Sequence, residues 1–175
     1  MKVLTLLRHA KSGWDDPVAR DFDRPLNPRG RRAAATVGRE MRRLGLAFDA
    51  VVASPARRVI ETLEEVEQAF GTLAPRYDER LYLASPETLL EVARATDDQI
   101  GHLLLVGHNP GLEELVLRLS ASSPLRSEAE VKYPTATLAQ MRLDVASWRQ
   151  LRDGGATLAR FVRPRDLDPA LGPDD

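Results

Sequence analysis

The chain has 175 residues, no cysteine and a formal net charge of −1 at neutral pH. This length suits one domain with a full hydrophobic core, and the 43% apolar and 29% charged fractions are ordinary for a globular protein. The lack of cysteine excludes a disulfide framework, a thiolate metal site and a cysteine nucleophile. The nearly neutral charge provides no global basic field that would recruit nucleic acid or an acidic membrane.

The first element is a short apolar run at residues 3–7, which predicts a buried strand. This run is too short for the core of a signal peptide, and no stretch of the sequence is long and apolar enough to span a bilayer. We therefore expect a cytoplasmic protein that has neither a membrane nor a nucleic acid as its partner.

Three pairs of a capping residue and a proline predict helix starts, because the cap accepts a backbone hydrogen bond and proline fits the first helical turn. The pairs are Asn27-Pro28, Ser54-Pro55 and Ser85-Pro86. The first helix is predicted to reach Leu44 and to end at Gly45, and the second covers residues 56–70. A turn at residues 107–111 leads into a fourth predicted helix.

Further strands are predicted at the apolar runs 50–53 and 102–106, at the short segment 81–83, and at the alternating segments 135–143 and 156–162. Buried strands that alternate with helices predict an α/β fold. We expect a three-layer αβα sandwich with a mostly parallel central sheet, an antiparallel edge strand and no large lid insertion. We expect one domain over residues 1–163, followed by a mobile tail over residues 164–175 that is rich in Pro and Asp.

Polar residues follow three of the predicted strands, where ligands bind in such folds. Arg8 and His9 follow the first strand, Ser54 and Arg57 follow the second, and His108 follows the strand at 102–106. Arginine offers phosphate a planar fork of donors, and a neutral imidazole is a good phosphoryl acceptor because its pKa lies near neutrality. This pattern predicts a phosphate site in which His9 is the nucleophile.

Five segments carry a resemblance to a known family. They are Leu7-Arg8-His9-Ala10-Lys11-Ser12, Ser54-Pro55-Ala56-Arg57, Gly107-His108-Asn109-Pro110, Asp23-Arg24-Pro25-Leu26-Asn27-Pro28-Arg29-Gly30 and Tyr133-Pro134-Thr135-Ala136. The first three resemble motifs of the histidine phosphatase, or phosphoglycerate mutase-like, superfamily. The last two resemble segments of its small SixA-type phosphohistidine phosphatase branch. The match runs in register from residue 3 to about residue 143 and so covers most of the chain.

The resemblance implies a role for each matching residue. His9 would be phosphorylated, Arg8, Arg57 and His108 would bind the phosphoryl oxygens, and Ser12 would place a hydroxyl near the phosphate. It implies no metal and no other cofactor. Neighbouring helix positions differ by about 100°, so Arg57 and Arg58 cannot both face the site, and we expect Arg58 to face solvent.

Four residues have weaker claims to a place in the site. Glu79 is a candidate general acid, although the sequence favours a surface charge at this position. Arg24 is either a pocket residue or half of a surface ion pair. The further pocket candidates are Asn27, which stands where the family usually has threonine, and Asn109.

The favoured function is removal of phosphate from phosphohistidine on another protein. The sequence has no insertion that could cover a small substrate and no firmly placed general acid, and a leaving imidazole needs less help from an acid than an alkoxide does. A small-molecule phosphomonoesterase would use the same site, with a small phosphate ester as substrate. A non-catalytic phosphate-binding module is the alternative from a different class, since it would need the arginines but not His9.

Overall fold

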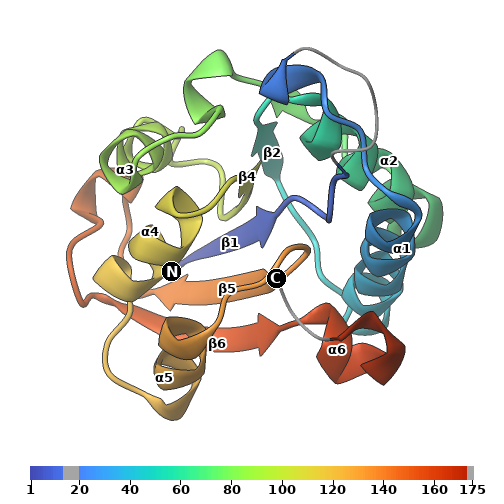
Figure 1. The fold of residues 1–175 in the computed structure, drawn as a ribbon. Helices are drawn as coiled ribbons and strands as arrows, with labels where there is room; N and C mark the ends of the chain where they lie inside the picture. The colour runs from blue at the N-terminus through green and yellow to red at the C-terminus, as the bar shows by residue number, and fades with distance from the viewer. Residues whose placement is uncertain (14–19, 173–175) are drawn as a thin grey trace.

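One mixed sheet forms the centre of the computed structural model, which describes residues 1–13 and 20–172 (Figure 1). Its order in the described part is β3-β2-β4-β1-β5-β6. The strands are β1 (Lys2–Arg8), β2 (Ala50–Ala53), β3 (Arg76–Tyr77), β4 (His102–Gly107), β5 (Leu138–Leu143) and β6 (Ala156–Val162). The first four are parallel, while β5 pairs antiparallel with both β1 and β6. The predicted α/β fold with a mostly parallel sheet is confirmed.

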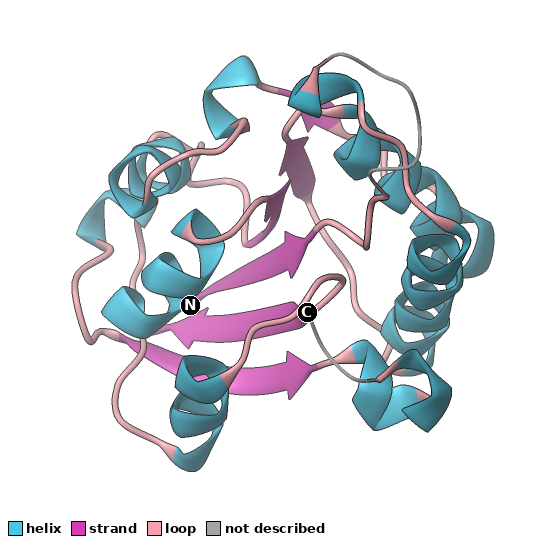
Figure 2. Cartoon of the chain, viewed as in Figure 1, coloured by secondary structure: helices cyan, strands magenta, loops and turns pink. Residues whose placement is uncertain are grey.

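Helices cover both faces of this sheet and create two apolar cores (Figure 2). One face carries α1 (Pro28–Arg43), α2 (Arg57–Phe70) and the short α6 (Pro164–Leu167). The other carries α3 (Pro86–Arg94), α4 (Gly111–Leu119) and α5 (Pro124–Val131). Single turns of 3₁₀ helix lie at η1 (Asp21–Asp23), η2 (Glu79–Leu81), η3 (Trp148–Gln150) and η4 (Pro169–Leu171). Only η2 and α3 lie between β3 and β4, so no large insertion follows β3.

Two of the three predicted caps are present, and the third residue has another role. Asn27 accepts a hydrogen bond from the Gly30 N–H at 2.7 Å, and Ser85 accepts one from the Thr88 N–H at 3.2 Å. Ser54 does not cap α2, which begins at Arg57 with Ala56 as its N-cap residue. The predicted start of that helix is therefore one residue too early.

Two other predictions differ from the structure, and one helix lies where none is predicted. Residues 81–83 form no strand, because the chain turns through η2 there and the short strand β3 comes earlier. β5 begins only at Leu138, since Ala136 has a left-handed backbone (φ 59°) that interrupts an extended run. The helix α5 was not predicted at all.

The segment after β6 is packed against the domain as far as it is described. α6 and η4 lie beside α1, Leu171 is buried, and the Arg29 guanidinium donates to the Gly172 carbonyl. Residues 164–172 therefore differ from the mobile tail that their composition predicts, because Leu167 and Leu171 supply apolar contacts to the core. Residues 173–175 lie outside the described part.

Within the described residues, no helix is long and apolar enough to cross a membrane. The cytoplasmic location stays a prediction.

Candidate active site

The loop after β1 is held from four sides, which places His9 at the carboxyl end of the parallel strands. The His9 N–H donates to the Gly107 carbonyl at 3.0 Å, and the His9 carbonyl accepts from the Ala136 N–H at 3.0 Å. The Ala10 N–H donates to Thr62 Oγ1 of α2 at 2.9 Å. On the side of α1, a Cβ atom on Gly30 would collide with the Lys11 backbone, so only glycine allows this close approach. The backbone of residues 9–11 is therefore held in one position.

The His9 ring has a defined tautomer. Its Nδ1 lies 2.7 Å from the Ala10 carbonyl oxygen, which can only accept a hydrogen bond. Nδ1 therefore carries the proton, and Nε2 keeps its lone pair. Burial is the main reason why the pKa of His9 lies well below 6.5. The hydrogen bond to Ala10 raises this pKa, whereas the charges of His108, Arg58 and Arg8 lower it. The ring is neutral at pH 7, which is the nucleophilic form.

The second histidine, His108, has the opposite arrangement. Its Nε2 lies 2.8 Å from Ser54 Oγ and its Nδ1 lies 3.3 Å from Arg58 Nη2. A guanidinium can only donate, so Nδ1 accepts and Nε2–H donates to Ser54. Burial, followed by the charge of Arg58, lowers the pKa of His108 to about 3. The ring centroids of His9 and His108 are 5.2 Å apart.

The structure places Arg58 in the site and turns Arg57 away from it. The Arg58 side chain is 4% exposed, whereas the Arg57 side chain is 48% exposed and donates to Glu61 at 2.9 Å. The expectation that Arg58 faces solvent is wrong. Each residue turns the helix by about 100° around its axis. The Arg57 side chain therefore points about 160° away from the buried Val59, and the Arg58 side chain only about 100° away. Arg58 can therefore reach the edge of the sheet.

A pocket of about 420 Å³ lies beside the nucleophile candidate His9. The lining combines the imidazole, four basic side chains and two hydroxyls: His9, Arg8, Lys11, Arg24, Arg58, Ser12 and Thr135. None of these described lining residues is acidic. Such a pocket favours a small, highly charged anion, and the arginine forks fit the geometry of phosphate oxygens.

Of the weaker candidates, only Arg24 lines the pocket, where its Nη2 donates to Ser12 Oγ at 2.7 Å. Asn27 and Asn109 belong to helix starts: Asn27 caps α1, and Asn109 Oδ1 accepts from the Glu113 N–H in α4. The Asn109 side-chain amide donates to the Tyr133 carbonyl, which also accepts from Arg8. Glu79 is exposed at the start of η2 and is not among the lining residues.

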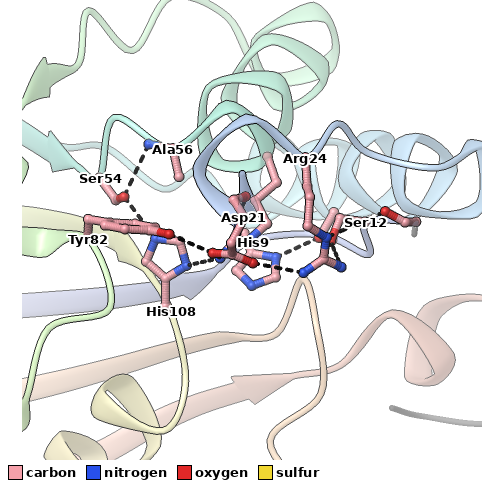
Figure 3. A network of polar contacts seen from close by, with 11 residues as sticks. His9, Ser12, Asp21, Arg24, Ser54, Ala56, Tyr82 and His108 are labelled. Atoms are coloured by element: carbon pink, nitrogen blue, oxygen red, sulfur yellow. Dashed lines mark hydrogen bonds and ion pairs between the residues drawn. The ribbon is translucent and has the colours of Figure 1, made fainter. Parts of the chain in front are cut away.

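Sequence reasoning missed Asp21 and Tyr82. Asp21 accepts hydrogen bonds from the Tyr82 hydroxyl at 2.6 Å and from Arg24 and Arg58 at 3.0 Å each (Figure 3). Burial raises the pKa of Asp21, but the bonds from Tyr82 and Arg24 and the charge of Arg58 outweigh this and lower it to about 2. The only sequence signal was the spacing of Asp21 and Arg24, which allows an i,i+3 ion pair.

The fold and the site together define a class of protein: an α/β protein in which a neutral histidine lines a pocket of basic side chains at the carboxyl ends of parallel strands. Among the described residues, no group of three or more His, Asp or Glu is arranged to hold a metal ion.

Comparisons with known proteins identify the family. The family model of the histidine phosphatase superfamily (branch 1) matches residues 4–82. An uncharacterized protein of Mycobacterium tuberculosis is 38% identical over 164 residues, which cover 91% of this chain and 100% of that protein. The chain belongs to the histidine phosphatase superfamily.

Solved structures extend the likeness to the whole fold. SixA from Agrobacterium tumefaciens superimposes with a TM-score of 0.80 at 28% identity, covering 93% of this chain and 98% of that chain. The protein histidine phosphatase SixA complexed with tungstate has the same fold, with a TM-score of 0.78 at 21% identity and coverage of 95% and 99%. The fold of this chain is therefore that of the SixA proteins.

The placement of the two arginines leads to a test of the site. We expect Arg58→Ala to lower kcat/KM for a phosphoryl substrate by roughly 10²–10³-fold, as the loss of one preorganised donor to transition-state charge does. Arg57→Ala is the matched control, and we expect it to change kcat/KM by no more than a few fold because its side chain is half exposed. A loss for Arg57→Ala as large as that for Arg58→Ala would contradict this site.

The low pKa of His108 should also make the fold sensitive to acid. The pKa of His108 is about 3 in the folded chain and about 6.5 when unfolded, so below pH 6.5 the unfolded state binds a proton that the folded state does not. The free energy of unfolding should fall as the pH drops from 6.5 towards 3, by at most about 1.4 kcal/mol per pH unit for each such histidine.

Urea unfolding at pH 7, 6 and 5 measures this slope. We expect His108→Asn, which cannot titrate, to make the slope shallower. His102→Asn is the control because His102 is exposed at the start of β4. An unchanged slope in His108→Asn would show that His108 is not held neutral by the fold.

Proposed function

We propose that this chain removes phosphoryl groups from phosphohistidine on other proteins, by way of a phosphohistidine at His9. One observation carries the proposal. The Ala10 carbonyl holds Nδ1–H of a neutral His9, which leaves the Nε2 lone pair for attack beside a pocket of four basic side chains. Membership of the superfamily supports phosphatase chemistry, and one solved structure of the same fold is that of a protein histidine phosphatase.

The reaction would proceed in two displacements. In the first, Nε2 of His9 forms a bond to phosphorus while the bond from phosphorus to the substrate imidazole breaks. Its electron pair returns to that imidazole, which carries a proton on its other nitrogen and leaves as the neutral ring. In the second, a water oxygen attacks phosphorus, the bond to Nε2 breaks, and inorganic phosphate leaves. The water proton goes to the released phosphate or to solvent.

Positively charged groups would stabilise the charge on the equatorial oxygens in both steps. Arg8, Arg24 and Arg58 line the pocket and keep their charge at any relevant pH. His108 would take up a proton when a phosphoryl group arrives, because the negative charge opposes the burial that keeps the ring neutral. Since Ser54 already accepts from Nε2–H, that proton would go to Nδ1 and would replace the hydrogen bond that Nδ1 accepts from Arg58.

The substrate preference follows from the leaving group. Glu79 is exposed and does not line the pocket, and none of the described lining residues is a carboxylic acid. A serine or sugar alkoxide needs a proton in the transition state, and general acid catalysis contributes roughly 10²–10⁴-fold. An imidazole that is protonated on its other nitrogen leaves without such help. The connection between β3 and β4 contains only η2 and α3, so it adds no large insertion that could cover a small substrate.

Trapping the intermediate tests the nucleophile. Rapid quenching with ³²P-labelled substrate should give a protein label that is stable in base and labile in acid, as expected for a phosphorus–nitrogen bond. His9→Ala should abolish the label. His102→Ala is the control and should keep it, since His102 is exposed at the far end of β4. A label that persists in His9→Ala would assign the nucleophile elsewhere.

A substrate panel tests the leaving-group argument. We expect protein phosphohistidine to be hydrolysed at least about 10²-fold faster than phosphoserine peptide or sugar phosphates. Glu79→Gln should leave phosphohistidine hydrolysis unchanged within a few fold, because its side chain lies outside the pocket. Rapid turnover of a small ester at low KM, or a large loss in Glu79→Gln, would favour a small-molecule phosphomonoesterase.

A further inference from the structure

The buried guanidinium of Arg58 connects two parts of the site that are far apart in sequence. Its Nη1 donates to the Asp21 carbonyl oxygen at 2.8 Å, and its Nη2 donates to Asp21 Oδ2 at 3.0 Å and contacts His108 Nδ1 at 3.3 Å. Asp21 is the only carboxylate that pairs with Arg58 among the described residues. The orientation of the guanidinium plane therefore depends on Asp21, which contacts it twice.

Asp21 is itself rigidly held. Its carbonyl oxygen also accepts from the Arg24 N–H at 3.1 Å, which closes the 3₁₀ turn η1. Its carboxylate accepts from the Tyr82 hydroxyl and from Arg24 Nη1 (Figure 3). The Tyr82 ring packs edge-on against Phe22 of η1 and against the His108 ring, with centroids 5.1 and 5.5 Å away. Hydrogen bonds from three other residues and a backbone turn hold Asp21 in place. This favours the role of a fixed support for Arg58 over that of a carboxylate that a substrate displaces.

This arrangement determines which nitrogen of His108 carries the proton. A neutral imidazole has one donor and one acceptor, and the ring alone has little preference between its two tautomers. Ser54 Oγ can accept or donate, so it does not decide the tautomer by itself. The guanidinium can only donate, so its position against Nδ1 leaves the proton on Nε2.

We infer that Asp21 is a positioning residue that aims Arg58 at Nδ1 of His108 and thereby holds His108 in its Nε2–H tautomer. The consequence is that Nδ1, which faces Arg58 of the pocket lining, is the only ring nitrogen that can gain a proton.

The inference rests on the proposed function in one respect, namely that His108 binds the phosphoryl group. Its main test needs no substrate. The chain has three histidines, so long-range ¹H–¹⁵N spectra can resolve each ring, and His102→Asn assigns one of them. The native protein should show His108 with a protonated Nε2 and an unprotonated Nδ1.

We expect Asp21→Asn to move both nitrogen shifts of His108 towards the values of a tautomer mixture. It should also weaken tungstate binding, measured by calorimetry, by at least about tenfold, the usual cost of losing a hydrogen bond to a charged group. Asp23→Asn is the matched control. Asp23 lies in the same 3₁₀ turn, but its described ion pair is with the exposed Arg20. It should keep the native His108 spectrum and the native tungstate affinity.

Two results would overturn the inference. An Asp21→Asn spectrum identical to that of Asp23→Asn would show that Asp21 does not set the tautomer. Tighter tungstate binding in Asp21→Asn would make Asp21 a competitor for Arg58. If Asp21→Asn does not fold, Arg58→Lys keeps the charge but lacks the fork that bridges Asp21 and His108, and the tautomer should change there as well. A wild-type protein that shows the expected spectrum but does not hydrolyse phosphohistidine would contradict only the proposed function.

Discussion

The hydrogen bond from His9 Nδ1 to the Ala10 carbonyl is the interaction on which the chemistry of this site depends. It leaves the lone pair on Nε2, the atom that attacks phosphorus in the proposed reaction, and it requires the backbone directly after β1 to stay in one place. Much of the fold serves that end. Thr62 of α2 holds the Ala10 N–H, the glycine in the first turn of α1 lets that helix approach Lys11, and β4 and the turn at Ala136 hold the His9 backbone. A loop supported in this way can place one atom accurately without a metal ligand or a disulfide to restrain it.

The electrostatics of the pocket depend on keeping cations close to neutral imidazoles. Arg8 and Arg58 lower the pKa of both histidines, in addition to the larger effect of burial. Asp21 opposes this effect at His108, because its negative charge raises that pKa. The carboxylate thus compensates the buried charge of Arg58 while lying outside the described pocket lining. A carboxylate in the lining itself would repel a phosphoryl dianion. Asp21 instead balances the charge of Arg58 from outside the described lining.

Several parts of this arrangement could be predicted from the sequence, for local reasons. Arg8, His9 and His108 each follow a buried apolar run, and the rule for parallel sheets brings such positions together. Ser54-Pro55 was misleading because the serine looks like a helix cap and instead contacts His108, so α2 begins later. The choice between Arg57 and Arg58 depended on that helix register. Asp21 could not be found in this way, because it lies 37 residues from Arg58 on a separate turn and no periodic pattern connects them.

The two histidines show how equal side chains acquire different roles from their neighbours. Both are buried, and both have a pKa far below that of a free imidazole. A carbonyl faces Nδ1 of His9, so that ring carries its proton there and keeps its lone pair on Nε2. A guanidinium faces Nδ1 of His108, so that ring carries its proton on Nε2 and can accept a second one only at Nδ1. Neither assignment follows from burial or from the pKa alone. The tautomer of each ring is decided by whether the group that faces its Nδ1 accepts or donates a hydrogen bond. For His9 that group is the backbone carbonyl of the next residue, and for His108 it is the Arg58 side chain of α2.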